Sequence, residues 1–369
     1  MSLALYRKYR PSVFADVIGQ EHVTVPLSNA LESGKTHHAY LFSGPRGCGK
    51  TSSARIMARS LNCEKGPTPN PCGKCQSCND LVANGPGSID VIELDAATHG
   101  LVDDARDLRD KAFFAPVQSK YKIYIIDEAH QLGPGAANAL LKVVEEPPAH
   151  AIFILATTEK HKIIPTILSR CQIFDFSRIS VKDIAAHLVN IAEKEQVSAE
   201  PEALHLIATK ADGALRDALS IFDQLVTFSN GNITYQTVLT NLHVLDYDYY
   251  FKIVDYLKKE DIAGSILILN DIIEKGFDGH QFIIGLADHF RNLLMAQDVR
   301  TLPLLELTDQ IKDRFKEQAS AWEKIQLTRA LYTLSKADVA YKSSKNQRLL
   351  VEVTLMELGS LQQEAEKKN

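Results

Sequence analysis

A glycine-rich segment near residue 45 has the residue types that bind phosphate. Its eight residues fit the pattern G-x-x-x-x-G-K-[ST], and they are Gly44, Pro45, Arg46, Gly47, Cys48, Gly49, Lys50 and Thr51. In this pattern backbone N–H groups turn toward the phosphates, the lysine reaches the β- and γ-phosphates, and the hydroxyl binds Mg²⁺. The segment follows an apolar run at 39–42 and precedes a helical stretch, which predicts an ATP site at the start of that helix. A chance match by a glycine-rich turn is the alternative interpretation.

A pair of acidic residues follows a second apolar run and is suited to hold the metal ion. The run 123–126 ends in Asp127 and Glu128. If this strand lies beside the strand that leads into the glycine-rich segment, Asp127 can hold Mg²⁺ through Thr51 and water. Glu128 can then accept a proton from the attacking water. Alone, the pattern also describes two acids that solvate a strand end, but next to a complete phosphate motif it predicts hydrolysis.

Four of the six cysteines fall within sixteen residues. Their spacing is C-x₈-C-x₂-C-x₂-C, and they are Cys63, Cys72, Cys75 and Cys78. Four thiolates are the ligand set of a closed structural Zn²⁺ site, and Gly73 permits a tight turn between two of them. An iron–sulfur cluster is the chemical alternative, although nothing else in the sequence indicates electron transfer. Cys48 and Cys171 are expected to be ordinary small apolar residues.

Short apolar runs that alternate with helical stretches predict the fold around these motifs. The runs lie at 39–42, 89–94, 123–126 and 151–156. Runs of this length, buried on both faces and separated by helices, are typical of a parallel sheet in a three-layer α/β domain.

The sequence after about residue 176 has a helical pattern. Ser180 and Asp183 have the spacing of a capping box, and Ser198 is expected to cap a second short helix. Apolar residues at helical spacing continue from about 243 to 361. We therefore expect a small helical domain followed by a larger all-helical domain.

Composition excludes some classes of protein. A net charge of -5 and a pI near 6.2 argue against nucleic-acid binding across the whole surface, but they allow a local basic face. No apolar run approaches the roughly 20 residues that cross a bilayer. The first eleven residues are charged and aromatic, without the apolar stretch of a secretory signal. We expect a cytoplasmic protein that does not bind membranes.

Several segments together resemble the AAA+ ATPases, and within them the clamp-loader clade. The matching segments are Tyr9-Arg10-Pro11, Phe14, the run 17–20, Asp127-Glu128-Ala129-His130, the run 138–148 and Ser169-Arg170-Cys171. The four-cysteine module is similar to that of the bacterial DNA polymerase III tau/gamma family, which implies that it binds zinc. Clamp-loader subunits of eukaryotes and archaea share the ATPase motifs but lack this module.

The resemblance implies a role for each matched residue. Lys50 and Thr51 would contact phosphate and Mg²⁺, Asp127 would hold Mg²⁺, and Glu128 would be the base. Thr158 would be sensor 1, which monitors the γ-phosphate and the attacking water.

Two arginines and an N-terminal segment complete the implied site. Arg216 would be sensor 2 and would bring the small helical domain onto the nucleotide. Arg170 would act in trans, on the nucleotide of the neighbouring subunit, as arginine fingers do. The adenine side of the site would be formed by Tyr9, Arg10, Pro11, Val17 and Ile18.

The same resemblance implies a domain plan and a function. The plan is an AAA+ ATPase domain at 1–178 with a zinc module at 63–78, a helical lid at 179–242, and a helical oligomerisation (collar) domain at 243–369. The implied function is to load a sliding clamp onto primed DNA with the energy of ATP. The implied partners are further copies of the chain, the delta and delta prime subunits, the beta clamp and primer–template DNA.

Two other functions remain as alternatives. One is a different AAA+ motor on DNA, for branch migration or helicase loading, and the zinc module and helical third domain argue against it. The other is a nucleotide-regulated scaffold of the replisome. The complete set of Lys50, Thr51, Asp127, Glu128 and Arg170 argues against a scaffold without useful hydrolysis.

Overall fold

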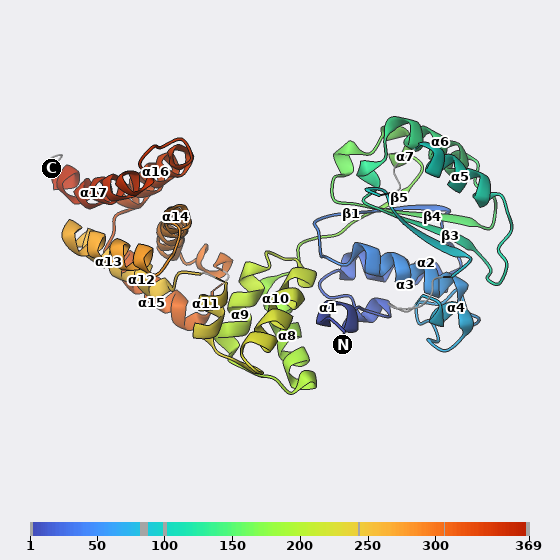
Figure 1. Ribbon diagram of the computed structural model, residues 1–369, viewed down its shortest axis with the longest axis horizontal. Coiled ribbons are helices and arrows are strands. Elements are labelled where there is room, and N and C mark those ends of the chain that lie inside the picture. The colour runs from blue at the N-terminus through green and yellow to red at the C-terminus, as the bar shows by residue number, and fades with distance from the viewer. Residues whose placement is uncertain (1–2, 82–87, 99–101, 243, 306, 367–369) are drawn as a thin grey trace. The chain divides into compact units, whose positions relative to one another are not determined.

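The computed structural model describes residues 3–81, 88–98, 102–242, 244–305 and 307–366 (Figure 1). Its contacts divide the chain into two compact units. Unit 1 comprises residues 1–198 and 207–231, and unit 2 comprises residues 199–206 and 232–369. Among the described residues, no helix is long and apolar enough to cross a membrane.

A parallel sheet forms the centre of unit 1, as predicted, and it has five strands where the sequence indicated four. Its strands are β1 (Ala39–Ser43), β2 (Val91–Asp95), β3 (Lys122–Asp127), β4 (Ala151–Thr157) and β5 (Gln172–Asp175), in the order β2-β3-β4-β1-β5. The expectation that the strand of the acidic pair lies beside the strand before the glycine-rich segment is wrong. β4 lies between them and pairs in parallel with both. β1 and β4 are both buried along their whole length, so the local pattern of burial does not determine which of them lies beside β3.

Helices cover both faces of this sheet and form a three-layer sandwich (Figure 1). On one face, Tyr40 and Phe42 pack with residues of α2 (Glu21–Glu32) and α3 (Lys50–Asn62). On the other face, Leu41 packs with residues of the helices α5 (Val102–Ala112), α6 (Pro134–Glu145) and α7 (Pro165–Leu168). Adjacent residues serve opposite faces because side chains alternate along a strand. Because all five strands are parallel, their carboxyl ends share one edge of the sheet, where the motifs lie.

The helices that follow the sheet are α8 (Val181–Glu195), α9 (Pro201–Lys210) and α10 (Leu215–Phe228). Ser180 caps α8 as predicted, because its hydroxyl accepts the N–H of Asp183. The expectation that Ser198 caps α9 is wrong. Ser198 lies in the short strand β6 (Ser198–Ala199), where its N–H donates to the Gly231 carbonyl at 2.9 Å. This pairing keeps its backbone extended, and α9 begins only at Pro201.

Unit 2 is helical, as predicted from its periodicity. After the short strand β7 (Asn232–Ile233), the chain of this unit forms seven α-helices. They are α11 (Tyr235–Asn241), α12 (Tyr247–Lys258), α13 (Ile262–Glu274), α14 (Gly279–Ala296), α15 (Asp309–Ser320), α16 (Lys324–Tyr341) and α17 (Gln347–Glu366), among the residues that the structure describes. Helices α12 to α17 share an apolar core, in which Phe282, Phe290 and Phe315 are fully buried. Each such ring contributes roughly 3–5 kcal/mol relative to alanine, so packing rather than helix propensity stabilises the unit.

Candidate nucleotide-binding site

The glycine-rich segment connects β1 to α3 and needs glycine for its backbone. Gly47 and Gly49 have φ angles of 76° and 107°, in the left-handed region that disfavours a side chain. A Cβ on Gly47 would also lie 2.9 Å from the Cβ of Ala214. Gly49 is the N-cap of α3, so the loop ends at a helix N-terminus with N–H groups free for an anion.

Lys50, Thr51 and Asp127 meet at the carboxyl edge of the sheet. Lys50 Nζ is buried and donates to the carbonyls of Gly44 at 2.8 Å and Pro45 at 2.6 Å, so it lies over the loop. Thr51 Oγ1 donates to Asp127 Oδ2 at 2.7 Å. A hydroxyl and a carboxylate that converge in this way are oxygen ligands of the kind Mg²⁺ prefers, so the donor set fits the ion.

Glu128 lies one residue beyond β3, in an unusual conformation. Its φ is 48°, which is rare for a residue with a side chain and turns the chain sharply after Asp127. Thr158 follows β4, and its Oγ1 donates to Glu128 Oε2 at 3.3 Å. The insertion of β4 between β1 and β3 thus brings the predicted sensor 1 residue to the predicted base.

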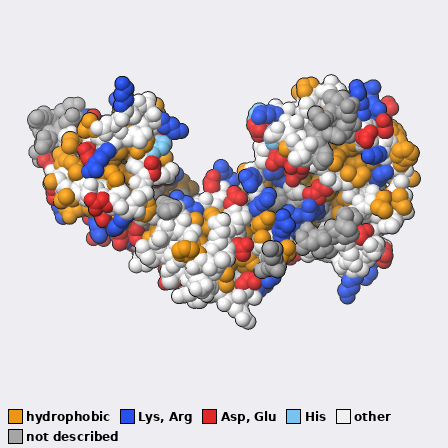
Figure 2. Space-filling view, viewed as in Figure 1, with side chains coloured by type: hydrophobic (Ala, Val, Ile, Leu, Met, Phe, Trp, Pro, Cys, Tyr) orange, Lys and Arg blue, Asp and Glu red, His pale blue; other side chains and the backbone are white. Residues whose placement is uncertain are grey.

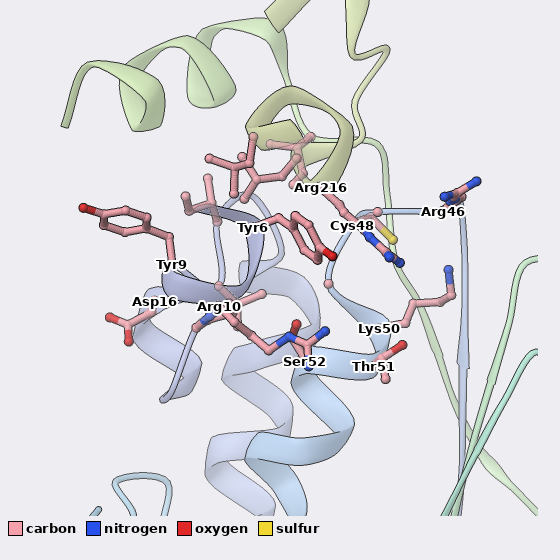
Figure 3. Close-up of a pocket in the computed structure, with 18 of the residues that line it drawn as sticks. Tyr6, Tyr9, Arg10, Asp16, Arg46, Cys48, Lys50, Thr51, Ser52 and Arg216 are labelled. Carbon is pink, nitrogen blue, oxygen red and sulfur yellow. The ribbon is translucent and has the colours of Figure 1, made fainter. Parts of the chain in front are cut away.

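A pocket lies beside these groups within unit 1 (Figure 3). It is lined by Tyr6, Tyr9, Arg10, Pro11, Asp16, Val17, Ile18, Arg46, Gly47, Cys48, Gly49, Lys50, Thr51, Ser52, Asp127, Glu128, Ile179, Leu215, Arg216 and Leu219. It therefore gathers the predicted phosphate, acidic and adenine-side residues with the predicted sensor 2 arginine. Tyr6, Asp16 and Ile179 were not predicted, because no motif marks them and they reach the pocket only through the fold.

Arg216 and the N-terminal residues join α10 to the pocket. The Arg216 guanidinium lies 5.2 Å from the centre of the Tyr6 ring, within the range of a cation–π contact. Tyr9 points away from Lys50 in Figure 3, and its hydroxyl donates to Glu195 of α8. Burial, with the Glu195 hydrogen bond second, raises the pKa of Tyr9 to about 12. Tyr9 therefore stays a neutral donor that ties the pocket wall to α8.

The charges around the pocket suit a triphosphate. Figure 2 shows Lys and Arg side chains gathered over the part of unit 1 that carries α1 (Leu5–Lys8), α3 and α10. Four basic residues line the pocket, and they are Arg10, Arg46, Lys50 and Arg216. Burial lowers the pKa of Arg10, because a partly desolvated guanidinium lacks some of its hydration. An anion there would restore that lost stabilisation.

Arg170 does not line this pocket in the part of the chain that the structure describes. It lies in a separate groove with His37, His38, Val144, Glu145, Ser169, Cys171 and Gln172. Its Nη2 is 2.6 Å from Glu145 Oε1, and its Nη1 donates to the Thr166 carbonyl at 2.8 Å. The arginine is partly exposed, so its guanidinium is accessible from outside the chain.

The four clustered cysteines come together as predicted from their spacing. Their Sγ atoms all lie within 4.8 Å of one another, and those of Cys72 and Cys78 are 4.0 Å apart. A tetrahedral Zn²⁺ with bonds of about 2.3 Å places its sulfurs about 3.8 Å apart, so the set fits this ion. Backbone N–H groups of Lys74 and Cys75 hold the pKa of the Cys72 thiol below its usual value. They favour the thiolate that binds metal.

Models of known families match successive parts of the chain. They are described as "DNA polymerase III, delta subunit" over residues 19–180, "DNA polymerase III clamp loader subunit, ATPase lid domain" over 183–231 and "DNA polymerase III subunits gamma and tau domain III" over 233–369. Among solved structures, Thermotoga maritima RuvB is similar at 22% identity with a TM-score of 0.48, covering 68% of this chain and 79% of that one. That likeness is too weak to assign a function.

Relatives with similar sequences carry gamma and tau names. DNA polymerase III subunit gamma/tau of Mycobacterium bovis is 47% identical over 96% of this chain and 62% of its own length. Subunit tau of Bacillus subtilis is 43% identical over 96% of this chain and 63% of its own length, so this chain spans somewhat less than two thirds of both. Subunit gamma of Buchnera aphidicola (subspecies Baizongia pistaciae) is 36% identical over 97% of this chain and 96% of its own length. On these matches and the fold and site that accompany them, the chain belongs to the gamma and tau subunit family of bacterial DNA polymerase III.

Proposed function

We propose that this chain is an ATPase subunit of a bacterial sliding-clamp loader that acts in the cytoplasm. It would bind and hydrolyse ATP to open the beta clamp and leave it closed on primed DNA. The observation that carries the proposal is the meeting of Lys50, Thr51, Asp127 and Glu128 at one edge of the sheet, with Thr51 and Asp127 in direct contact. Membership in the gamma and tau family supports the same function.

The predicted site residues have distinct tasks in this mechanism. The glycine-rich loop and Lys50 would hold the phosphates. Thr51 and Asp127 would hold Mg²⁺, which would neutralise charge on the phosphates. Glu128 takes a proton from a water molecule as the water oxygen attacks the γ-phosphorus and the bond to ADP breaks. Thr158 donates to Glu128 and orients it.

Arg170 would complete the site of a neighbouring subunit. Its position outside its own pocket, on an accessible surface of unit 1, supports action in trans. The guanidinium would stabilise the charge that develops on the transferred phosphoryl group. Hydrolysis would therefore depend on assembly with further copies of the chain and with the delta and delta prime subunits.

The domain plan is proposed on the same grounds. Residues 1–178 would be the ATPase domain, 179–242 a lid that follows the nucleotide through Arg216, and 243–369 the collar through which subunits assemble. The contact of Arg216 with Tyr6 at the pocket supports the role of the lid. Primer–template DNA and the beta clamp would be bound by the assembly.

The experiment that tests this function is transfer of a labelled beta clamp to primed circular DNA. The full chain is assembled with delta and delta prime, and DNA-bound clamp is separated by gel filtration. Clamp is expected on DNA with Mg-ATP and not without nucleotide, and Lys50→Ala should abolish transfer because the phosphates lose their cation. Equal transfer without nucleotide would indicate a scaffold. Hydrolysis stimulated by branched DNA without clamp transfer would indicate a different motor.

We also propose that the four-cysteine module holds one structural Zn²⁺. Sulfur atoms within 4.8 Å of one another suit a single ion rather than a cluster whose irons each take their own thiolate. Cys75→Ser is expected to remove the zinc and to lower the unfolding midpoint by more than about 5 °C, because metal binding is coupled to folding. Elemental analysis measures the bound zinc, and thermal unfolding measures the midpoint. Cys171→Ser, outside the module, is the control. Iron in the purified wild type, or no bound metal, would refute the assignment.

A further inference from the structure

The aromatic ring of Tyr6 lines the nucleotide pocket, although no motif marks this residue. Tyr6 belongs to α1 and is half-buried. The Arg216 guanidinium lies over its ring, 5.2 Å from the ring centre. Figure 3 shows the two side chains next to each other, one from α1 and the other from α10. The pair therefore joins the N-terminal segment to a helix of the proposed lid inside the pocket.

The backbone that carries Arg216 lies close to the phosphate loop. Arg216 is in the first turn of α10, and Ala214 is the N-cap of this helix. Ala214 approaches the loop so closely that a Cβ on Gly47 would lie 2.9 Å from its own Cβ. Because the helix start is fixed in this way, the place of the guanidinium depends on what holds the flexible arginine side chain.

The Tyr6 ring is the group that holds this side chain. Among the residues that the structure describes, no carboxylate pairs with the Arg216 guanidinium, and the ring is its one close attractive contact. Other cations nearby repel it. Burial lowers the pKa of Arg10, and the positive charges of Arg55 and Arg216 lower it further. Without the ring, the guanidinium would move out into solvent, where like charges are screened.

The ring is itself held in place by contacts of α1 with a second helix of the proposed lid. The Tyr9 hydroxyl donates to the Glu195 carboxylate of α8, and Lys8 Nζ lies 2.6 Å from the same carboxylate. Leu5, the first residue of α1, is buried. Tyr6 is thus carried by a segment that is anchored on both sides of it.

An aromatic face suits this task better than a carboxylate. A carboxylate would occupy the N–H groups of the arginine and neutralise its charge, whereas a ring attracts the guanidinium and leaves its five N–H groups to bind phosphate oxygens. The Tyr6 hydroxyl makes no hydrogen bond to any residue that the structure describes, so the ring face alone provides the contact. Phenylalanine would keep that face, and leucine would not.

We propose that Tyr6 is a positioning residue for Arg216, whose guanidinium it holds in the pocket before nucleotide binds. An arginine that is already ordered loses less conformational entropy when it engages the phosphates, so ATP binds more tightly. The inference rests on the proposed function of the pocket as an ATP site with Arg216 as a phosphate ligand.

Equilibrium binding of Mg-ATP to the full chain tests this role. Tyr6→Leu is expected to raise the Kd about 3- to 10-fold, because a partly desolvated cation–π contact is lost. Tyr6→Phe should stay within about twofold of the wild type, since it keeps the ring. In an Arg216→Ala background, Tyr6→Leu should raise the Kd no further, because the side chain that it positions is gone.

Arg7→Ala is the matched control for the arginine. Its guanidinium lies 5.6 Å from the centre of the same ring, but Arg7 is exposed and does not belong to the residues that line the pocket. Arg7→Ala should leave the Kd unchanged, and Tyr6→Leu should keep its full effect in the Arg7→Ala background. The same dependence on Arg7 as on Arg216 would contradict the proposal.

The remaining outcomes separate this inference from the proposed function. If Lys50→Ala loses ATP binding while Tyr6→Leu binds as the wild type does, the positioning role is refuted and the ATP site stands. If Lys50→Ala binds ATP with the wild-type Kd, the pocket is not the nucleotide site. An equal loss in Tyr6→Phe and Tyr6→Leu, with a lowered unfolding midpoint, would make Tyr6 a packing residue. A full effect of Tyr6→Leu in the Arg216→Ala background would show that Tyr6 acts independently of Arg216, and either result refutes the inference.

Discussion

Glu128→Gln is expected to lower the rate of ATP hydrolysis by about 10²- to 10⁴-fold and to leave ATP binding intact. An amide has nearly the shape of the carboxylate but cannot accept the proton of the attacking water. Lys50, Thr51 and Asp127 remain in place, since the hydrogen bonds of Lys50 to the loop carbonyls and of Thr51 to Asp127 do not involve the Glu128 side chain. Single-turnover hydrolysis and equilibrium binding of Mg-ATP measure the two quantities separately.

A matched substitution at the surface controls for this prediction. Glu32 is an exposed glutamate at the end of α2, so Glu32→Gln changes the charge of the chain equally without touching the pocket. It should hydrolyse ATP at the wild-type rate. If Glu128→Gln loses binding in parallel with hydrolysis, then Glu128 holds the nucleotide and is not the base.

Arg170→Ala is expected to lower hydrolysis by the assembled loader on the order of 10³-fold, again with ATP binding retained. The guanidinium would contact the transition state in the neighbouring site, so its removal leaves the pocket of its own chain unchanged. Steady-state hydrolysis with primed DNA and clamp, compared with and without partner subunits, measures the effect.

Two further results are expected for Arg170. Arg170→Lys should recover only part of the rate, because an ammonium keeps the charge but not the planar fork that engages two phosphoryl oxygens. Without partner subunits, wild type and Arg170→Ala should hydrolyse ATP at the same slow rate. A loss of activity in the isolated variant would instead indicate that Arg170 supports its own pocket.

The isolated chain already holds Arg170 in a defined place. Glu145 and the Thr166 carbonyl bind its guanidinium on the surface of unit 1. Because both partners are partly exposed, this ion pair is worth little in water and can be exchanged for contact with a phosphate. Assembly would therefore complete a site that one chain leaves open.

The residues proposed to hold phosphate and Mg²⁺ could be assigned from sequence because each lies in a recognisable local pattern. A strand, a glycine-rich turn and a helix place Lys50 and Thr51 within one segment, and Asp127 ends a run that is plainly a buried strand. The order of the strands could not be predicted in this way. Periodicity shows that β4 is buried on both faces, but it does not show which strands it separates.

The contacts of His130 and Tyr6 could not be predicted from the sequence, because they depend on which elements the fold brings together. His130 lies close to Glu159 only because β3 and β4 are neighbouring strands and each residue follows the end of one of them. Tyr6 meets Arg216 across more than two hundred residues of sequence. The expected helix cap at Ser198 failed because a backbone pairing with Gly231, invisible in the local pattern, holds that residue extended.

The most direct test of a site shared between subunits mixes two inactive variants before assembly with delta and delta prime. Glu128→Gln supplies an intact Arg170, and Arg170→Ala supplies an intact Glu128. Stimulated ATP hydrolysis by the mixed loader is predicted to exceed clearly that of either variant alone, because some neighbours then combine both intact groups. If the mixture is no more active than the average of the two, Glu128 and Arg170 do not act across an interface, and the shared-site mechanism is contradicted.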